Sequence, residues 1–337
     1  MISASAMRRS RPRIGLVLGA GGVLGGAWMT GALAALQDRL SLPLGEADVI
    51  VGTSAGSVLA AALRCGLTVD EIVGHQRHGP SGALAILGSP DLGCTALPPW
   101  PRPGVGSPRM LLAALLAPHR VPPWVVASAW LPQGRADHTV LHTMVQDLVS
   151  LGDQRRELTD VAEWAAGGRT WVVAVDYDSG RRVVFGRRAA PPASLPDAVT
   201  ASCSVPGWYR PMMIGGRRYV DGGVHSATSA ALLARAGLDE VYVLAPMASL
   251  VCGPPRTPAE RAERLVRRWI TFALSREAGV LRSRGIKVTL LTPGPEDLDA
   301  MGANLMDPAR RQRVFETSMH TSARRMRPSG PSSRHAA

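Results

Sequence analysis

Ser54 stands in a pentapeptide, GTSAG at residues 52–56, whose spacing suits a nucleophilic serine. An apolar run at 48–51 predicts a strand before it, and an apolar run through Leu63 predicts a helix after it. Gly-x-Ser-x-Gly at a sharp strand-to-helix turn is the pattern of a nucleophile elbow, because the flanking positions must lack bulk while the hydroxyl projects from the turn. The positive end of the helix dipole would favour a developing anion there. The alternative is an ordinary turn in which Ser54 only caps the helix.

A glycine-rich loop, GAGGVLG at residues 19–25, follows the first predicted strand. Glycine allows consecutive backbone amides to converge on one anionic oxygen, so such a loop suits an oxyanion hole or a phosphate site. The loop also fits a dinucleotide-binding fingerprint, which requires an acidic residue closing a second strand about twenty residues later. Asp48 lies near that distance but opens its strand, and that strand leads to Ser54. The order of elements therefore favours an oxyanion loop.

A serine hydroxyl needs a base to take its proton, and Asp221 is the better candidate for that base. It ends a short predicted strand and precedes Gly222 and Gly223, which let the backbone turn away and leave the carboxylate facing the site. A carboxylate has a pKa of about 4, so the chemistry would depend on the oxyanion loop, the helix dipole and exclusion of water. Asp221 could instead be a simple turn residue before glycine.

His225, just past a turn, is the main alternative base. The other histidines considered show no triad spacing: His75, His78, His119, His138 and His142.

The elements that must position these residues alternate between strands and helices. Ile14–Leu18 predicts a strand, and a helix to about Leu40 follows the glycine loop. Two buried strands that each feed a helix through a tight turn predict a parallel sheet covered on both faces. A β-hairpin is expected from 171–176 and 182–185. Further elements are helices at 139–148, 196–202, 258–281 and 308–326, strands at 240–245 and 287–291, and a short hairpin leading to 219–223.

Composition limits the function classes. The 337 residues are enough for one large α/β domain or two ordinary ones, and 46% hydrophobic and 19% charged residues are an ordinary globular balance. The formal charge of +12 would attract anionic lipid headgroups, whereas no nucleic-acid-binding motif accompanies it, so nucleic acid is not an expected partner. The four cysteines are far apart and show no zinc spacing, so we expect no metal site and a reducing, cytoplasmic location. They are Cys65, Cys94, Cys203 and Cys252.

The N-terminal region has a basic stretch followed by an uncharged run from Ile14 to Leu36. The run holds seven glycines, so it is better explained by a strand, a loop and a helix than by a signal peptide or membrane span. We expect a disordered basic arm at 1–13, a catalytic domain at 14–235, its α/β completion at 236–326, and a disordered tail at 327–337.

Two segments have open interpretations. Residues 79–135 carry many prolines and read as an irregular surface insertion, or as a lid whose tryptophans touch a lipid interface. The Arg-rich amphipathic helix at 258–281, together with the basic arm, would either hold the chain on an anionic membrane or be a solvated charged face.

In combination, these motifs resemble the patatin-like phospholipases over about residues 14–235. The glycine loop, the GTSAG elbow and the Asp-Gly-Gly triplet occur in that family's order, and three further stretches also look like its sequence: AVDYDSG at 174–180, ASCSVPG at 201–207 and GRRYVDGG at 216–223. The resemblance implies a three-layer α/β/α fold with a mostly parallel central sheet. It also implies hydrolysis of acyl esters in phospholipids or neutral lipids, a Ser–Asp dyad without histidine, and no metal or cofactor.

Carried over by position, the resemblance makes Ser54 the nucleophile and Asp221 the base, with the backbone amides of Gly21 and Gly22 as the oxyanion hole. The supporting motif glycines are Gly19, Gly25, Gly52, Gly56, Gly222 and Gly223.

Two positions depart from the family pattern. Ala20 stands where the family usually has glycine, and Leu24 where it usually has arginine or lysine. Ala20 is tolerable if its φ is negative. Leucine at position 24 removes a positive charge near the glycine loop, and this loss would lower activity or shift substrate preference. These departures leave two alternatives to a lipid acyl hydrolase: a catalytically silent lipid-binding or regulatory protein of the same fold, and a Ser–His–Asp esterase.

Overall fold

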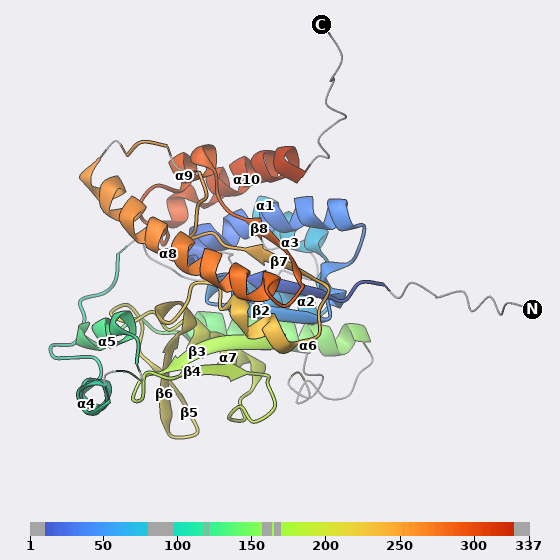
Figure 1. Cartoon of the computed structure of the whole chain (residues 1–337). Helices are drawn as coiled ribbons and strands as arrows, with labels where there is room; N and C mark the ends of the chain where they lie inside the picture. The colour runs from blue at the N-terminus through green and yellow to red at the C-terminus, as the bar shows by residue number, and fades with distance from the viewer. Residues whose placement is uncertain are drawn as a thin grey trace, which may run out of the picture.

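The computed structural model describes residues 11–79, 97–117, 119, 121–156, 164, 170–251, 253–255 and 257–326. At its centre is an eight-stranded sheet in the order β5-β6-β3-β2-β1-β7-β8, with β4 paired to β3 (Figure 1). The strands are β1 (Ile14–Leu18), β2 (Val49–Thr53), β3 (Thr170–Asp176), β4 (Arg182–Phe185), β5 (Met212–Ile214), β6 (Arg217–Asp221), β7 (Glu240–Leu244) and β8 (Lys287–Leu291).

The sheet is mostly parallel, as predicted. Strands β3, β2, β1, β7 and β8 pair in parallel, while β4, β5 and β6 form antiparallel pairs at one end. Every residue of β1, β2 and β3 is buried, which explains why these strands are continuous apolar runs and do not alternate with polar residues.

Helices cover both faces of the sheet, so the predicted three-layer α/β/α fold is confirmed. Side chains of a strand alternate between the faces: Leu16 and Leu18 belong to one core cluster and Val17 to the other. The first face is covered by α1 (Gly22–Leu40), α2 (Ala55–Arg64), α3 (Val69–His78), α6 (Thr139–Arg156), α7 (Leu195–Ser202), α9 (Pro295–Met301) and α10 (Arg311–Met326). The second face is covered by α8 (Pro258–Arg282) and a 3-10 helix at Ala230–Arg235.

Segments far apart in sequence close the first layer. The Ser318 hydroxyl of α10 donates a 2.7 Å hydrogen bond to the Trp28 carbonyl of α1. A Cβ on Gly31 would lie 2.7 Å from that hydroxyl oxygen, so the two helices are in contact. The C-terminal helix therefore belongs to the same core as the first one.

The predicted irregular insertion at 79–135 contains two helices, α4 (Pro108–Leu116) and α5 (Pro123–Trp130). Each helix begins at a proline, Pro108 or Pro123, because proline fits the first helical turn, whereas the prolines around Trp100 lie outside both helices. Both helices contribute to a third buried cluster, in which Met110 and Val125 pack against Tyr177. Residues 80–96 of the insertion lie outside the described residues.

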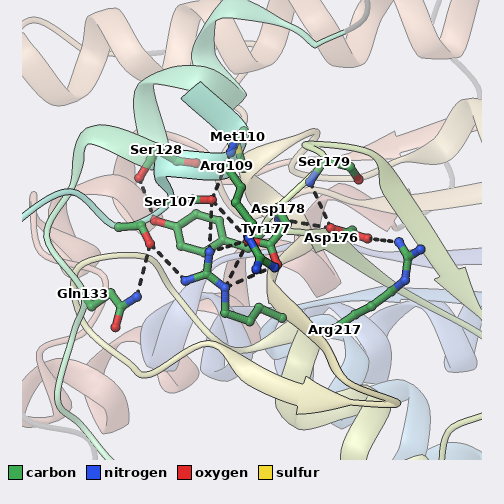
Figure 2. Close-up of polar contacts among 12 residues, drawn as sticks. Ser107, Arg109, Met110, Ser128, Gln133, Asp176, Tyr177, Asp178, Ser179 and Arg217 are labelled. Carbon is green, nitrogen blue, oxygen red and sulfur yellow. Dashed lines mark hydrogen bonds and ion pairs between the residues drawn. The ribbon is translucent and has the colours of Figure 1, made fainter. Parts of the chain in front are cut away.

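Arg218 of β6 holds this insertion against the sheet. Its guanidinium pairs with Asp178, stacks over the Tyr177 ring at 5.4 Å, and donates to the Gly106 carbonyl and the Ser107 hydroxyl, both at 3.2 Å. Figure 2 shows Ser107, Tyr177 and Asp178 gathered around this point. The Asp178 and Arg218 side chains therefore fix the position at which the segment carrying α4 and α5 leaves the sheet.

The predicted terminal arms fall mostly outside the described residues. Arg13 is already part of the fold, since its amide donates to the Asp239 carboxylate at 2.7 Å and its carbonyl accepts from the Asp239 amide at 2.9 Å. None of the described helices has the length and apolar character needed to cross a membrane.

Candidate active site

Ser54 lies at the point where β2 ends and α2 begins, with φ at 53° and ψ at −127°. A positive φ is unfavourable for a residue with a side chain and marks a strained position. Hydrogen bonds hold the turn: the Ser54 amide donates to the Ser202 hydroxyl at 2.8 Å, and the Ser57 hydroxyl donates to the Ser54 carbonyl at 2.6 Å. The Ser202 hydroxyl in turn donates to the Val173 carbonyl at 2.6 Å. The strained turn is thus supported by neighbouring β3 and α7.

The glycines beside Ser54 are required by close packing. A Cβ on Gly52 would lie 2.5 Å from the Ser57 Cα, and a Cβ on Gly56 would lie 2.0 Å from the Leu18 carbonyl oxygen. No side chain fits at either position without moving backbone. The elbow therefore brings the first turn of α2 directly against the end of β1, where the glycine loop begins.

Asp221 lies at the end of β6, and its carboxylate is held on two sides. One oxygen accepts a 2.7 Å hydrogen bond from the Gly223 amide, and the Ser54 side chain lies close enough to the carboxylate to lower its pKa. Burial raises the pKa of Asp221 from 3.8 to about 6, while the bonds from Ser54 and Gly223 oppose that rise. The carboxylate is therefore a stronger base than an exposed aspartate and is still mostly ionised at neutral pH.

The twin glycines after Asp221 have different roles. A Cβ on Gly222 would lie 2.3 Å from the Val173 carbonyl oxygen, so this position has no room for a side chain. A Cβ on Gly223 would lie 3.0 Å from an Asp221 carboxylate oxygen and 3.1 Å from the Ala20 Cβ. The Asp221 turn and the glycine loop are therefore neighbours in space.

The glycine loop is fixed by hydrogen bonds on both sides of its centre. The amides of Gly19 and Ala20 donate to the carbonyls of Leu244 and Ala227, at 2.9 and 2.7 Å. Further along, the Leu24 amide donates to the Leu305 carbonyl at 3.0 Å.

Within the described residues, the amides of Gly21 and Gly22 have no acceptor. Gly22 has φ at 60°, and both Gly22 and Ser54 line the same cavity. Two amides at a helix N-terminus thus remain available next to the serine, and this arrangement suits an anionic oxygen.

Close packing also explains the other loop glycines. A Cβ on Gly21 would lie 2.7 Å from Pro246 Cγ, and one on Gly25 would lie 3.1 Å from the same atom. A Cβ on Gly19 would meet two carbonyl oxygens at 3.0 Å. The ring of Pro246 therefore supports the back of the loop.

The two positions that depart from the family pattern are both buried. Ala20 is not among the residues with positive φ, so its methyl group causes no backbone strain. Leu24 is fully buried in the first core cluster and contributes nothing to the cavity. The described residues that line the cavity include no arginine or lysine.

The cavity beside Ser54 has a volume of about 120 Å³ and mostly apolar walls. Its lining includes Val23, Val58, Leu59, Leu141, Val205, Tyr209 and Met306, with polar groups from Gln76, Asp137 and His138. Such a lining suits a hydrocarbon chain more than a charged group.

Two histidines lie close enough to deserve comparison with Asp221. His138, which sequence spacing did not single out, lines the Ser54 cavity. Its Nε2 is bonded to the Ser204 hydroxyl at 2.9 Å and to the Arg210 carbonyl at 3.1 Å, and its ring stacks on Tyr209. Burial lowers the pKa of His138. Its Nε2 is thus occupied by groups other than the serine.

His225 lines a different hollow, together with Trp124 and Trp269. Burial lowers the pKa of His225 to about 4, and its Nδ1 has no partner among the described residues. Within the part of the chain described, the Ser54 side chain therefore interacts with Asp221 and with neither histidine.

Comparison with known proteins gives a family match over two segments. Residues 16–77 and 164–234 match the family model "Patatin-like phospholipase". The first segment holds the glycine loop and Ser54, and the second holds Ser202 and Asp221. No curated protein sequence is significantly similar to this chain.

Among solved structures, the chain is similar to VipD from Legionella pneumophila, with 13% identity and a TM-score of 0.42, over 94% of this chain and 67% of that one. It is also similar to the type III effector protein ExoU, with 14% identity and a TM-score of 0.37, over 94% of this chain. The chain spans 53% of the length of ExoU.

Proposed function

We propose that this chain, whose residues 16–77 and 164–234 match the patatin-like phospholipase family, is a lipid acyl hydrolase that uses Ser54 and Asp221 as a dyad. The observation that carries the proposal is the interaction of the buried Asp221 carboxylate with the Ser54 side chain, at a turn with positive φ. The unoccupied amides of Gly21 and Gly22 beside that turn give the reaction a site for its developing negative charge.

In the first half-reaction, the Ser54 Oγ attacks the ester carbonyl carbon while its proton passes to Asp221. The carbonyl oxygen becomes an oxyanion that accepts hydrogen bonds from the Gly21 and Gly22 amides. When the tetrahedral intermediate collapses, the bond to the alcohol oxygen breaks, and that oxygen takes the proton from Asp221. The product alcohol leaves and the acyl group stays on Ser54.

In the second half-reaction, water attacks the acyl carbon while Asp221 takes its proton. The second tetrahedral intermediate collapses by breaking the bond to Ser54, and Asp221 returns the proton to the serine oxygen. One ester bond and one water are consumed, and one acid and one alcohol are formed. The raised pKa of Asp221 supports this role, because a base works best when its pKa is near the working pH.

The cavity lining supports an acyl chain as the group bound beside Ser54. Its walls are mostly apolar, and the described lining residues provide no cation for a phosphate. Phospholipids and neutral lipids both carry such chains, so the recognised part is the acyl ester itself. A phospholipid headgroup would lie outside this cavity.

A fluorophosphonate probe and a water-soluble acyl ester test the proposal. Wild type should react with the probe at Ser54, and Ser54→Ala should neither react nor hydrolyse the ester. Asp221→Asn should lower kcat by about a thousandfold or more. His225→Ala and His138→Ala are the matched controls and should keep most of the activity. If only a histidine variant abolishes turnover, the dyad assignment is wrong.

Leu24 favours a second candidate, a lipid-binding protein of the same fold without catalysis, because a basic residue is expected at that position. A chain that binds lipid but leaves Ser54 unreactive toward the fluorophosphonate would identify this function. If Ser54 does react with the probe, a panel of phospholipid, lysophospholipid and triglyceride substrates, run beside Ser54→Ala, would define the substrate of the enzyme.

A further inference from the structure

The outer face of α8 combines apolar side chains with arginines. Leu265, Trp269 and Phe272 are 64%, 46% and 63% exposed, and their spacing places them on one side of the helix. Arg268 and Arg276 lie on the same side and are exposed. A surface helix normally turns such residues inward, so this face is available for another partner.

The acidic residues of this part of the helix point elsewhere. Between 261 and 280 they are Glu263 and Glu277. Glu263 pairs with the buried Arg267, and Glu277 accepts hydrogen bonds from the turn at 226–230. Within the described residues, Arg268 and Arg276 have no ion pair. The outer face therefore carries positive charge that its own helix does not neutralise.

The insertion extends this face through Trp124 of α5. The rings of Trp124 and Trp269 meet edge to face with centroids 4.9 Å apart, and Trp124 is 44% exposed. Its indole N–H donates to the His225 carbonyl at 3.3 Å, which holds the ring in place. Trp269 lies near the middle of α8, so α5 meets this long helix at its centre. Tryptophan is the side chain most characteristic of a membrane–water interface.

We propose that Trp124, Leu265, Arg268, Trp269, Phe272 and Arg276 form a docking surface for an anionic lipid bilayer. This inference rests on the proposed function, since an enzyme that cleaves lipid esters must reach a bilayer. Aromatic and aliphatic side chains enter the interface while guanidinium groups bind lipid phosphates. The net charge of +12 on the whole chain adds a long-range attraction between the protein and an anionic bilayer.

A second copy of the chain fits this face less well than a bilayer. A two-fold interface would place the patch against itself, so that Arg268 and Arg276 would meet arginines of the other copy. The patch has no acidic residue to offset that repulsion. An anionic bilayer provides the complementary charge.

The same helix also supports the glycine loop. Arg267 donates to the Pro246 carbonyl at 2.7 Å, and Pro246 packs against Gly21. Glu277 holds the 226–230 turn, whose Ala227 carbonyl accepts from the Ala20 amide. The docking surface and the oxyanion loop are therefore attached to opposite sides of one helix, which fixes their relative position.

Vesicle binding of the full chain carrying Ser54→Ala tests the surface without hydrolysing the lipid. The vesicles are phosphatidylcholine alone, and phosphatidylcholine mixed with phosphatidylglycerol. The protein should bind the mixed vesicles far better, and binding should weaken as salt rises. Arg268→Gln and Arg276→Gln should each weaken binding about fivefold. Trp269→Ala with Phe272→Ala should weaken it about tenfold or more at every salt concentration.

Matched controls lie on other surfaces. Met213→Ala removes an apolar side chain that is 55% exposed on β5, and Arg313→Gln removes an exposed arginine on α10. Both should bind vesicles as the parent protein does. Equal binding by surface and control variants, equal binding to both vesicle types, or a dimer that depends on Trp269 would each overturn the proposal.

Activity on a soluble ester separates this proposal from the proposed function. The surface variants with Ser54 intact should hydrolyse it at the wild-type rate, which also shows that they fold. Vesicle binding without any esterase activity would support the docking surface and contradict the hydrolase. Esterase activity without vesicle binding would support the hydrolase and contradict the docking surface.

Discussion

At the scale of single residues, the site contains two features that folding stability alone would not favour. Ser54 has a positive φ although it carries a side chain, and Asp221 is a buried carboxylate whose raised pKa is opposed by no cation among the residues described. Each lowers the stability of the fold by an amount that the surrounding packing must offset. Unfavourable features of this kind gather at functional sites, and here the two side chains interact with each other.

The pKa of Asp221 predicts the acid limb of the pH–rate profile. The carboxylate must be ionised to accept the Ser54 proton, so kcat/KM should be level above pH 6 and fall about tenfold per pH unit below it. The measurement is kcat/KM for a soluble ester whose leaving group does not titrate in this range. An acid limb centred near pH 4, or one that His138→Ala removes, would contradict this assignment.

Asp221→Asn should make the protein more stable while it abolishes turnover. A pKa raised from 3.8 to about 6 corresponds to about 3 kcal/mol of unfavourable burial, which is fully present above pH 6 and vanishes as the pH falls below 4. Asparagine keeps an oxygen that can accept from Gly223.

Urea unfolding of Asp221→Asn and wild type at pH 8 and pH 4 checks this sign. The difference in free energy of unfolding should favour the variant at pH 8 and shrink at pH 4. Equal stabilities at pH 8 would count against an ionised, desolvated carboxylate.

At the scale of secondary-structure elements, α7 and β3 decide the position of Ser54, the proposed nucleophile. The fully buried Ser202 hydroxyl, at the C-terminal end of α7, lies between the Ser54 amide and the Val173 carbonyl. It contacts no reacting atom in the proposed mechanism. We therefore regard Ser202 as a positioning residue for the elbow.

Ser202→Ala should lower kcat about tenfold or more with little change in KM. Without the Ser202 hydroxyl, the buried Ser54 amide loses its acceptor and the buried Val173 carbonyl loses this donor. The free energy of unfolding should therefore also fall by about 1–3 kcal/mol. Kinetics on a soluble ester and urea unfolding measure the two effects.

Ser128→Ala provides the matched control for Ser202→Ala. Ser128 is also buried, and its hydroxyl donates to the Val125 carbonyl at 2.6 Å in the α5 segment, outside the Ser54 cavity. The Ser128→Ala variant should be less stable than wild type but should keep the wild-type kcat. A similar fall in kcat for both variants would show that Ser202 acts only through stability.

At the scale of the whole molecule, the sheet joins the segments that carry Ser54 and Asp221 to the C-terminal part of the chain. Strand β7 pairs with β1, and α10 packs on α1, so residues 236–326 cover elements that carry the glycine loop. Residues 14–235 alone would therefore lack the β7 partner of β1 and the α10 partner of α1.

A chain ending at residue 235 should fail to fold. It would expose β1 as an edge strand and uncover the apolar side of α1. A chain ending at residue 326 is the control and should unfold in one cooperative transition like the full chain. Circular dichroism and thermal unfolding of both chains make the comparison. A stable, active 14–235 fragment would contradict the description of one shared core.

Several structural features could be predicted from sequence alone. Strands at 14–18, 182–185 and 287–291 agree with the structure to the residue, because each is a short apolar or β-branched run with turn residues at its ends. The elbow around Ser54, the glycine loop and the turn after Asp221 were also apparent. Glycine at these positions reflects a local lack of space, which leaves a mark in the sequence.

Other features depended on packing between distant residues. Residues 79–135 were expected to be irregular, yet they contain α4 and α5, because prolines that start helices look like prolines that break them. The support of Ser54 by Ser202, the burial of Leu24, the place of His138 in the cavity and the exposed side of α8 follow from segments that meet only in the folded chain. Sequence by itself thus determined which residues could react. The tertiary structure decided which of them meet, how deeply they are buried and how basic Asp221 becomes, because burial and long-range hydrogen bonding are properties of the packed molecule.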